Sequence, residues 1–129
     1  MIEAFNPDKA PKVLGPYSHA IKANNFLFVS GQLPINPQNG QIESLDIEAQ
    51  TQQVLNNLET VLKSAGLDQR SVVRCDIFLK NLRDFSKVNA IYGDFFDTKT
   101  KPARQTVEVS RLPMDALIEI SCIACYKMD

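Results

Sequence analysis

The chain has 129 residues, a formal net charge of −1 at pH 7 and 44% hydrophobic residues. This length predicts one domain, over residues 1–129, that buries about two-thirds of its unfolded surface. The near-neutral charge, without blocks of like charge, argues against a surface built to bind nucleic acid or an acidic membrane. Because there is no apolar run of about 18 residues and no leader-like pattern at the start, we expect a cytoplasmic protein.

Cysteine usage supports the same compartment. Three cysteines, Cys75, Cys122 and Cys125, are an odd number, which favours reduced thiols. If Cys122 and Cys125 lie on one strand, their three-residue separation places them on opposite faces, so they cannot hold one metal ion together. We therefore predict no metal site and interpret the cysteines as small buried residues.

The first organised stretch is a predicted hairpin. Residues 18–23 and 26–30 are typical of strands, and Asn24-Asn25 suits the turn between them. Gly31 follows directly, where glycine permits either a sharp turn or a close approach of backbone to a ligand. His19, the only histidine, is interpreted as a structural or surface strand residue rather than an acid–base group.

A long helix is predicted next. Asp46 can cap it and Gly66 can end it. Apolar residues recur at steps of three and four along one stripe, at Ile47, Val54, Leu55, Leu58, Val61, Leu62 and Ala65. The polar side is interpreted as solvated surface and carries Gln50, Gln53, Asn57 and Lys63.

A strand and a second helix follow. Residues 71–79 alternate, which places Val73, Cys75, Ile77 and Leu79 on one side and Arg74 and Asp76 on the other. Asp84 can cap a helix from Phe85 to about Phe96. Asn89 lies one turn after Phe85, at the edge of the apolar stripe, although an asparagine inside a helix is usually just exposed.

The last two predicted strands carry the residues with chemical potential. From Arg104 the types alternate, so Arg104, Thr106 and Glu108 share one face, with Val107 and Val109 on the other. The run over residues 116–124 holds a single charge, Glu119, which is costly to bury without a partner or a role. A turn at residues 111–115 could bring Glu119 near Arg104. The result is either a carboxylate-binding fork beside a general base or, as is more common for such pairs, a structural ion pair.

The order of elements predicts an α+β domain: a mixed β-sheet with two amphipathic helices on one face. The sequence carries no GxSxG, no Gly-rich phosphate loop and no GxGxxG. We therefore expect no cofactor, and any chemistry must come from Arg, Glu, Tyr, Asn, hydroxyl and backbone groups.

Several motifs together resemble one family. They are Gly15-Pro16-Tyr17-Ser18-His19-Ala20, Val29-Ser30-Gly31-Gln32, Val88-Asn89-Ala90-Ile91-Tyr92, Lys101-Pro102-Ala103-Arg104, Val107-Glu108-Val109, Arg111-Leu112-Pro113 and Ile118-Glu119-Ile120. In this order they resemble the reactive-intermediate deaminase family RidA, also called YjgF/YER057c/UK114. The resemblance implies a chorismate-mutase-like fold and a homotrimer with clefts between neighbouring subunits. It also implies hydrolytic deamination of 2-imino acids or enamines, such as 2-iminobutanoate and 2-iminopropanoate, to 2-keto acids and ammonia.

The resemblance also implies roles for individual residues. Arg104 would grip the substrate carboxylate, and Glu119 would accept a proton from water. Thr106 would orient the nitrogen or the water, and the pocket would be completed by Tyr17, Ser30, Gly31 and Asn89. Many relatives have cysteine at the position of Thr106. A threonine hydroxyl is a poor nucleophile, so a mechanism that needs a thiolate is disfavoured here.

Two other functions stay open at this stage. The chain could be a non-enzymatic protein that binds small carboxylates such as 2-keto acids, with Arg104 holding the ligand and Glu119 merely paired. It could also have the chaperone-like or ribonuclease-like role attributed to some relatives. The lack of a basic aromatic patch makes nucleic acid an unlikely ligand.

Overall fold

The computed structural model describes residues 1–127. Its strands are β1 (Ile2–Phe5), β2 (Ala20–Ala23), β3 (Phe26–Gln32), β4 (Val72–Leu79), β5 (Ala103–Glu108) and β6 (Ile118–Cys125). Its helices are α1 (Ile47–Ser64) and α2 (Phe85–Phe95), with short 3₁₀ turns at Gln69–Ser71, Leu82–Asp84 and Pro113–Asp115.

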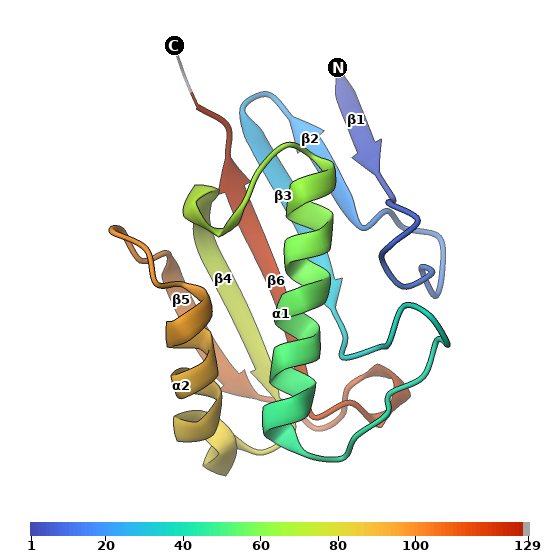
Figure 1. Ribbon diagram of the computed structural model, residues 1–129, viewed down its shortest axis with the longest axis vertical. Coiled ribbons are helices and arrows are strands. Elements are labelled where there is room, and N and C mark those ends of the chain that lie inside the picture. Colours follow the sequence, from blue (N-terminus) through green and yellow to red (C-terminus); the bar gives the residue numbers. More distant parts are fainter. Residues whose placement is uncertain (128–129) are drawn as a thin grey trace.

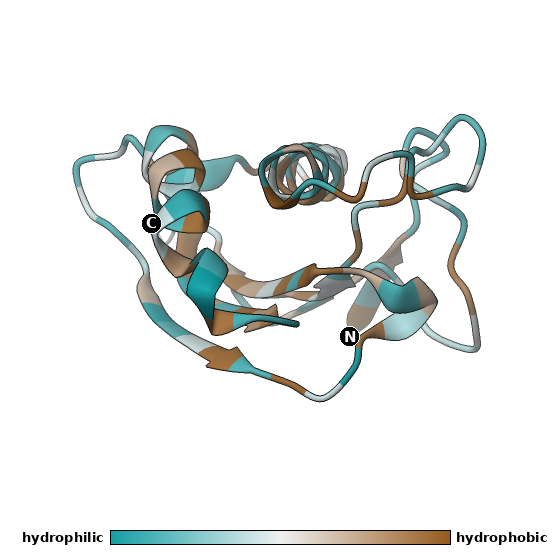
Figure 2. Ribbon diagram, turned by 90° about the horizontal axis from the view of Figure 1, so that it is seen from below, coloured by the Kyte–Doolittle hydropathy of each residue, from teal (hydrophilic) through white to brown (hydrophobic). Residues whose placement is uncertain are grey.

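The strands form one mixed sheet in the order β1-β2-β3-β6-β4-β5 (Figure 1). All neighbours are antiparallel except β4 and β5, which are parallel and are connected through α2. Both helices lie on one face of the sheet, and the other face is left open (Figure 2). The predicted α+β fold with two helices on one face is confirmed. No helix within residues 1–127 is long and apolar enough to cross a membrane.

Helix α1 begins and ends where the sequence predicts. The side chain of Asp46 accepts a hydrogen bond from the backbone N–H of Ala49 at 3.2 Å. Gly66 follows the helix with a φ of 80°, a conformation in which glycine avoids the strain that a Cβ would cause. The predicted apolar stripe packs into the core between α1 and the sheet.

The prediction that the polar side of α1 is solvated is wrong for Gln50 and Asn57, which are each only 2% exposed. The Asn57 amide donates to the backbone carbonyls of Leu33 and Ile35, both at 2.9 Å. The Gln50 amide accepts from the N–H of Leu117 at 2.8 Å and also donates to a loop carbonyl. These amides are buried because connecting segments cross the helix here and need partners for their backbone groups.

Asp84 directly precedes α2, as predicted, but its side chain makes no hydrogen bond at the start of the helix. The chain instead enters α2 through the turn Leu82–Asp84, and the side chain of Asn81 accepts from the N–H of Arg83 at 3.0 Å. The cap therefore lies three residues earlier, because the 3₁₀ turn runs directly into the helix.

Strand β4 departs from simple alternation at its start. Val73 is 44% exposed, whereas Val72 is buried, so Val73 does not share the buried face of Cys75, Ile77 and Leu79. The register against β6 shifts between Val72 and Arg74. A bulge of this kind inserts one extra residue and reverses the alternation at that point, which composition alone does not reveal.

Candidate active site

Arg104 and Glu119 do not lie on neighbouring strands. Strand β4 separates β5 from β6, with Arg104 level with Cys75 and Glu119 level with Phe78. Arg104 shares the helix-covered face with Cys75, whereas Glu119 alternates with the buried Ile118 and Ile120 and lies on the open face. The expectation that the turn at residues 111–115 brings Arg104 and Glu119 together within one chain is wrong.

Helix α2 holds the side chain of Arg104. Nη1 of Arg104 donates to Oδ1 of Asn89 at 2.7 Å. The guanidinium carbon lies 4.9 Å from the ring centre of Tyr92 and 5.4 Å from that of Phe85. Phe85, Asn89 and Tyr92 follow one another at steps of four and three, so one side of α2 supplies all three contacts. The sequence predicted Asn89 as a site residue, but it gave no signal that Phe85 and Tyr92 flank the arginine.

Thr106 lies beside Arg104 on the same face of β5, level with the buried Ile77. Its hydroxyl oxygen is buried and has no hydrogen-bond partner among the described residues. The nearby Cys75 is also buried, and burial raises the pKa of its thiol to about 11. Cys75 is therefore protonated near neutral pH and unsuited to act as a thiolate. The unpartnered Thr106 hydroxyl remains able to bind water or a ligand atom.

Glu119 lies against Gly31 on the open face. A Cβ placed on Gly31 would be 2.6 Å from Cδ of Glu119 and 2.9 Å from its Cγ, so only glycine allows this approach. Both residues line a hollow of about 390 Å³, together with Leu14, Tyr17, Ser30, Leu33 and Pro113. Burial raises the pKa of the Glu119 carboxyl group. A carboxylate with a raised pKa is a better proton acceptor than an exposed one.

The hydroxyl groups of the other two polar residues that line this hollow, Ser30 and Tyr17, already make hydrogen bonds within the chain. The hydroxyl of Ser30 donates to the carbonyl of Ser18 at 2.7 Å, and the hydroxyl of Tyr17 accepts from the N–H of Leu14 at 3.2 Å. Each hydroxyl keeps one remaining capacity, because Ser30 can still accept and Tyr17 can still donate.

The predicted residues thus form two groups. The first, Arg104, Asn89 and Thr106, lies between β5 and α2. The second, Tyr17, Ser30, Gly31 and Glu119, lines the hollow on the open face. An ion pair between Arg104 and Glu119, the other interpretation of these charges, is absent within residues 1–127.

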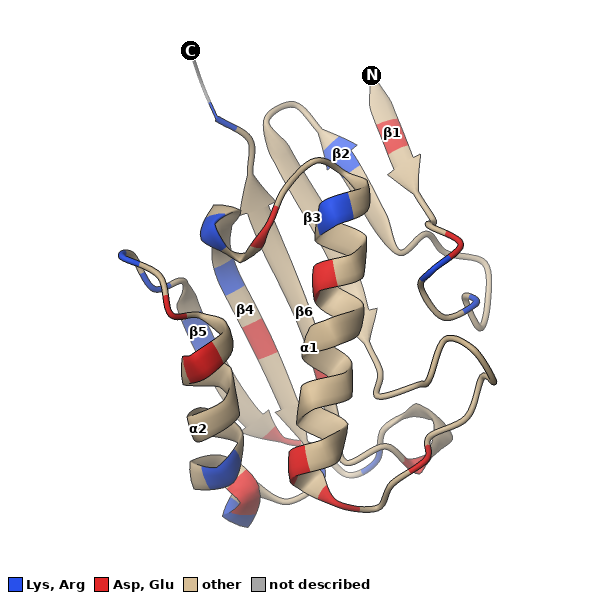
Figure 3. Ribbon diagram, viewed as in Figure 1, with Lys and Arg blue, Asp and Glu red and all other residues tan. Residues whose placement is uncertain are grey.

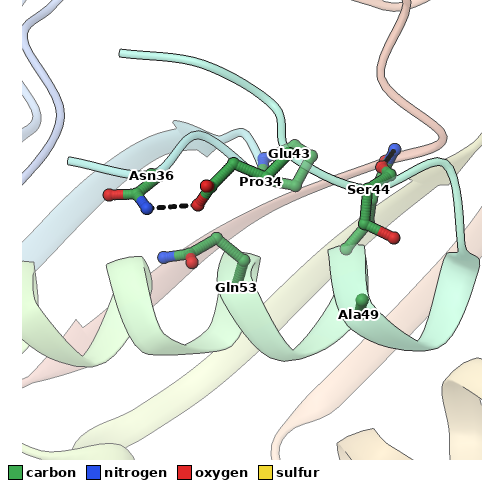
Figure 4. A pocket seen from close by; sticks show the side chains of 7 residues that line it. Pro34, Asn36, Glu43, Ser44, Ala49 and Gln53 are labelled. Atoms are coloured by element: carbon green, nitrogen blue, oxygen red, sulfur yellow. Dashed lines mark hydrogen bonds between the residues drawn. The ribbon is translucent and has the colours of Figure 1, made fainter. Parts of the chain in front are cut away.

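A separate hollow of about 180 Å³ lies between α1 and the loop that follows β3 (Figure 4). Its polar walls include Asn36, Glu43 and Gln53, and the Asn36 amide donates to the Glu43 carboxylate. None of the predicted site residues lines it. Within residues 1–127, no three His, Cys, Asp or Glu side chains are arranged to hold a metal ion. This hollow therefore adds no residue to the two groups described above, which contain all the predicted site residues.

Comparison with known proteins places these residues in a family. The family model described as Endoribonuclease L-PSP matches residues 7–126. A RutC family protein of Pyrococcus horikoshii is 50% identical over 98% of this chain and 99% of its own length. The chloroplastic Reactive Intermediate Deaminase A of Arabidopsis thaliana is 49% identical over 95% of this chain and 65% of that protein. The crystal structure of YyfA, a Rid family protein of unknown function from Yersinia pestis, superposes with a TM-score of 0.95 at 46% identity, covering 97% of this chain and 99% of that one. The chain therefore belongs to the Endoribonuclease L-PSP family, which is the YjgF/RidA family that its motifs resemble.

Proposed function

We propose that the protein hydrolyses reactive 2-imino acids and their enamine tautomers, such as 2-iminobutanoate and 2-iminopropanoate, to 2-keto acids and ammonia. The observation that carries this proposal is the Glu119 carboxyl group, which is held against Gly31 in a hollow and has a pKa raised by burial. Membership of the Rid family, which includes a protein named as a reactive intermediate deaminase, supports the same reaction.

The chemistry requires few groups. The planar guanidinium of Arg104 binds the α-carboxylate of the substrate through paired hydrogen bonds. Glu119 accepts a proton from water as the water oxygen attacks the electrophilic C2 atom of the protonated imine, which gives a tetrahedral carbinolamine. Glu119 then returns this proton to the nitrogen. The carbon–nitrogen bond breaks, ammonia leaves, and the hydroxyl group loses its proton to the Glu119 carboxylate or to solvent as the 2-keto acid forms. Thr106 and Asn89 lie beside the arginine, whereas Tyr17 and Ser30 flank the glutamate. No cofactor takes part.

The complete site is proposed to form between two copies of the chain. Arg104 and Glu119 lie on opposite faces of one sheet, so they can act on one substrate only if they come from different subunits. The open face also exposes apolar side chains that a partner would cover, including Phe26, Phe28 and Val107, which are 43%, 46% and 40% exposed. A contact between two different patches of the chain builds a ring when the rotation between neighbouring subunits closes. The family resemblance implies three copies, so we propose a homotrimer.

The activity is tested by following ammonia or keto-acid release while 2-iminobutanoate or 2-iminopropanoate is generated in the assay. We expect the purified protein to accelerate hydrolysis above the spontaneous rate. Arg104→Ala and Glu119→Ala should each abolish that acceleration. If the wild-type protein gives no acceleration but binds a 2-keto acid through Arg104, the protein is a carboxylate-binding protein instead.

A mixing experiment tests whether two chains share the site. Chains carrying Arg104→Ala and chains carrying Glu119→Ala are unfolded, mixed in equal amounts and refolded together. If each site takes Arg104 from one chain and Glu119 from another, about one site in four is intact after random association. A mixture of Arg104→Ala with the Arg104→Ala/Glu119→Ala double variant is the inactive control. No recovery in the test mixture, despite formation of mixed oligomers, would refute a shared site.

The charge distribution favours this function over a ribonuclease-like one. Within residues 1–127, positive and negative residues are interspersed along the helices, strands and loops, and both helices carry both signs (Figure 3). A protein that cleaves RNA needs contacts to several phosphates, which basic clusters supply.

A cytoplasmic location belongs to the same proposal, because Cys75, Cys122 and Cys125 are all free thiols.

A further inference from the structure

The single histidine of the chain lies behind the hollow that holds Glu119. His19 is only 6% exposed and precedes β2, whereas Gln32 is 2% exposed and ends β3. Both residues also line a small hollow next to Gly31. Neither side chain takes part in the proposed reaction, so their burial and hydrogen bonding call for another explanation.

Strand β3 is irregular at the site. Its register against β6 runs from Val29 opposite Cys122 to Gln32 opposite Ile120, so Ser30 and Gly31 together face a single residue of β6. This bulge brings the backbone of Gly31 against the Glu119 side chain. The position of Glu119 therefore depends on how firmly Ser30 and Gly31 are held.

Three hydrogen bonds hold Ser30, two of them to residues just before β2 and one from the end of β3. Its N–H donates to the carbonyl of His19 at 2.9 Å, and its hydroxyl donates to the carbonyl of Ser18. Its own carbonyl accepts from Nε2 of Gln32 at 3.1 Å. The amide nitrogen of Gln32 must point this way, because a carbonyl oxygen only accepts hydrogen bonds.

The same Gln32 nitrogen lies 3.2 Å from Nδ1 of His19, and Nε2 of His19 lies 2.5 Å from the carbonyl oxygen of Pro11. Since both partners are fixed in their roles, Nε2 of His19 must carry the proton and Nδ1 must accept. The result is a chain of hydrogen bonds, here called the relay, that runs from the carbonyl of Pro11 through the neutral His19 ring and the Gln32 amide to the carbonyl of Ser30.

We propose that His19 and Gln32 are positioning residues that fix the Ser30–Gly31 bulge, and through it the Glu119 carboxylate. The proposal rests on the proposed function for its catalytic consequence. The hydrogen-bond relay itself can be tested without any activity.

The first test uses ¹⁵N-histidine-labelled protein, in which only one imidazole ring is observed because the chain has one histidine. We expect a protonated Nε2 and an unprotonated Nδ1. The Nδ1 signal should shift in Gln32→Met, which keeps the length of the side chain but has no N–H donor. Exchange of the Ser30 amide hydrogen should become faster in this variant, while that of Phe28, in the same strand, stays slow. A protonated Nδ1 in the wild type, or unchanged Ser30 exchange in Gln32→Met, would overturn the relay.

The second test measures turnover in Gln32→Glu, in Gln32→Met and in His19→Phe. Each should lose at least about tenfold in kcat with KM little changed, since Glu119 is displaced but Arg104 is not. The effects of His19→Phe and Gln32→Met should not add in the double variant, because both break one relay. Tyr126→Phe, which removes a partly buried hydrogen bond to the carbonyl of Ala65 beyond the C-terminal end of β6, is the matched control and should keep its activity.

The outcomes separate the two proposals. If the wild type does not turn over imines, the proposed function fails, while the histidine spectrum and amide exchange still decide the relay. If the wild type is active and folded Gln32 variants keep full kcat, His19 and Gln32 have no positioning role.

Discussion

The contact between Gly31 and Glu119 gives the sharpest prediction, which is the effect of Gly31→Ala. The new Cβ would lie closest to Oε2 of Glu119 and 2.6 Å from its Cδ, so the carboxyl group must retreat by about 1 Å to reach an ordinary contact of 3.4 Å. The three atoms nearest to the new Cβ all belong to the flexible, half-buried Glu119 side chain, and the backbone of Gly31 is not in the left-handed region. The strain is therefore relieved by moving Glu119, and the free energy of unfolding should fall by no more than about 1 kcal/mol.

The effect on catalysis should be much larger. A displacement of a reacting group by about 1 Å can cost roughly 100-fold in rate, so we expect a loss of that order in kcat/KM for imine hydrolysis. Thermal unfolding at one fixed protein concentration measures the stability change, because subunit association makes Tm depend on concentration.

The Glu119→Ala background provides the decisive control. Removing the carboxyl group removes the clash, so Gly31→Ala should no longer destabilise the protein in this background. The reasoning is refuted if Gly31→Ala keeps wild-type activity. It is also refuted if Gly31→Ala destabilises the Glu119→Ala protein as strongly as the wild type, since the conflict would then involve the backbone.

Three further predictions concern other parts of the chain. Arg104→Lys keeps the charge but loses the planar fork and the stacking on α2, so kcat/KM should fall by about 10- to 100-fold, chiefly through KM, in steady-state assays; an unchanged KM would contradict its role as carboxylate anchor. Burial raises the pKa of Glu119, so the folded state binds a proton more tightly than the unfolded state does. This proton binding stabilises the fold at low pH, and the stabilisation is lost as the pH rises through the raised pKa. Glu119→Gln should therefore be more stable than the wild type at neutral pH, and this difference in stability should vanish in acid. Denaturant titrations at several pH values measure it, and a difference that does not change with pH would contradict the reasoning. Asn57→Leu leaves the carbonyls of Leu33 and Ile35 without their donor and should cost about 2–4 kcal/mol in urea unfolding, whereas a loss below about 1 kcal/mol would mean that water replaces the amide.

Local patterns in the sequence predicted much of the fold. The stripe of α1, its Asp46 cap and its Gly66 end follow from a period of 3.6 residues and from the chemistry of helix ends, which depend on neighbours a few residues apart. The alternation from Arg104 onward likewise assigned Arg104, Thr106 and Glu108 to one face of their strand. The predicted layer arrangement, with two helices on one face, is confirmed.

Departures from the predictions occur where distant segments meet. Val73 is exposed because a bulge forms against β6, and Gln50 is buried because the segment leading into β6 needs its amide. Neither partner lies within reach of a local pattern, since each contact joins residues far apart in the chain. A sequence period identifies a face, but it does not identify what covers that face.

The sequence by itself determined the candidate residues, their local elements and the family, because these depend on residue types and on short spacings. Only the tertiary structure decided that β4 separates Arg104 from Glu119 and that the two side chains lie on opposite faces. It also decided that the Ser30–Gly31 bulge presses Gly31 against Glu119. The physical reason is that strand order and register are set by the pairing of the whole sheet, which minimises exposed apolar area and unpaired backbone groups together, and no single stretch of sequence contains that information.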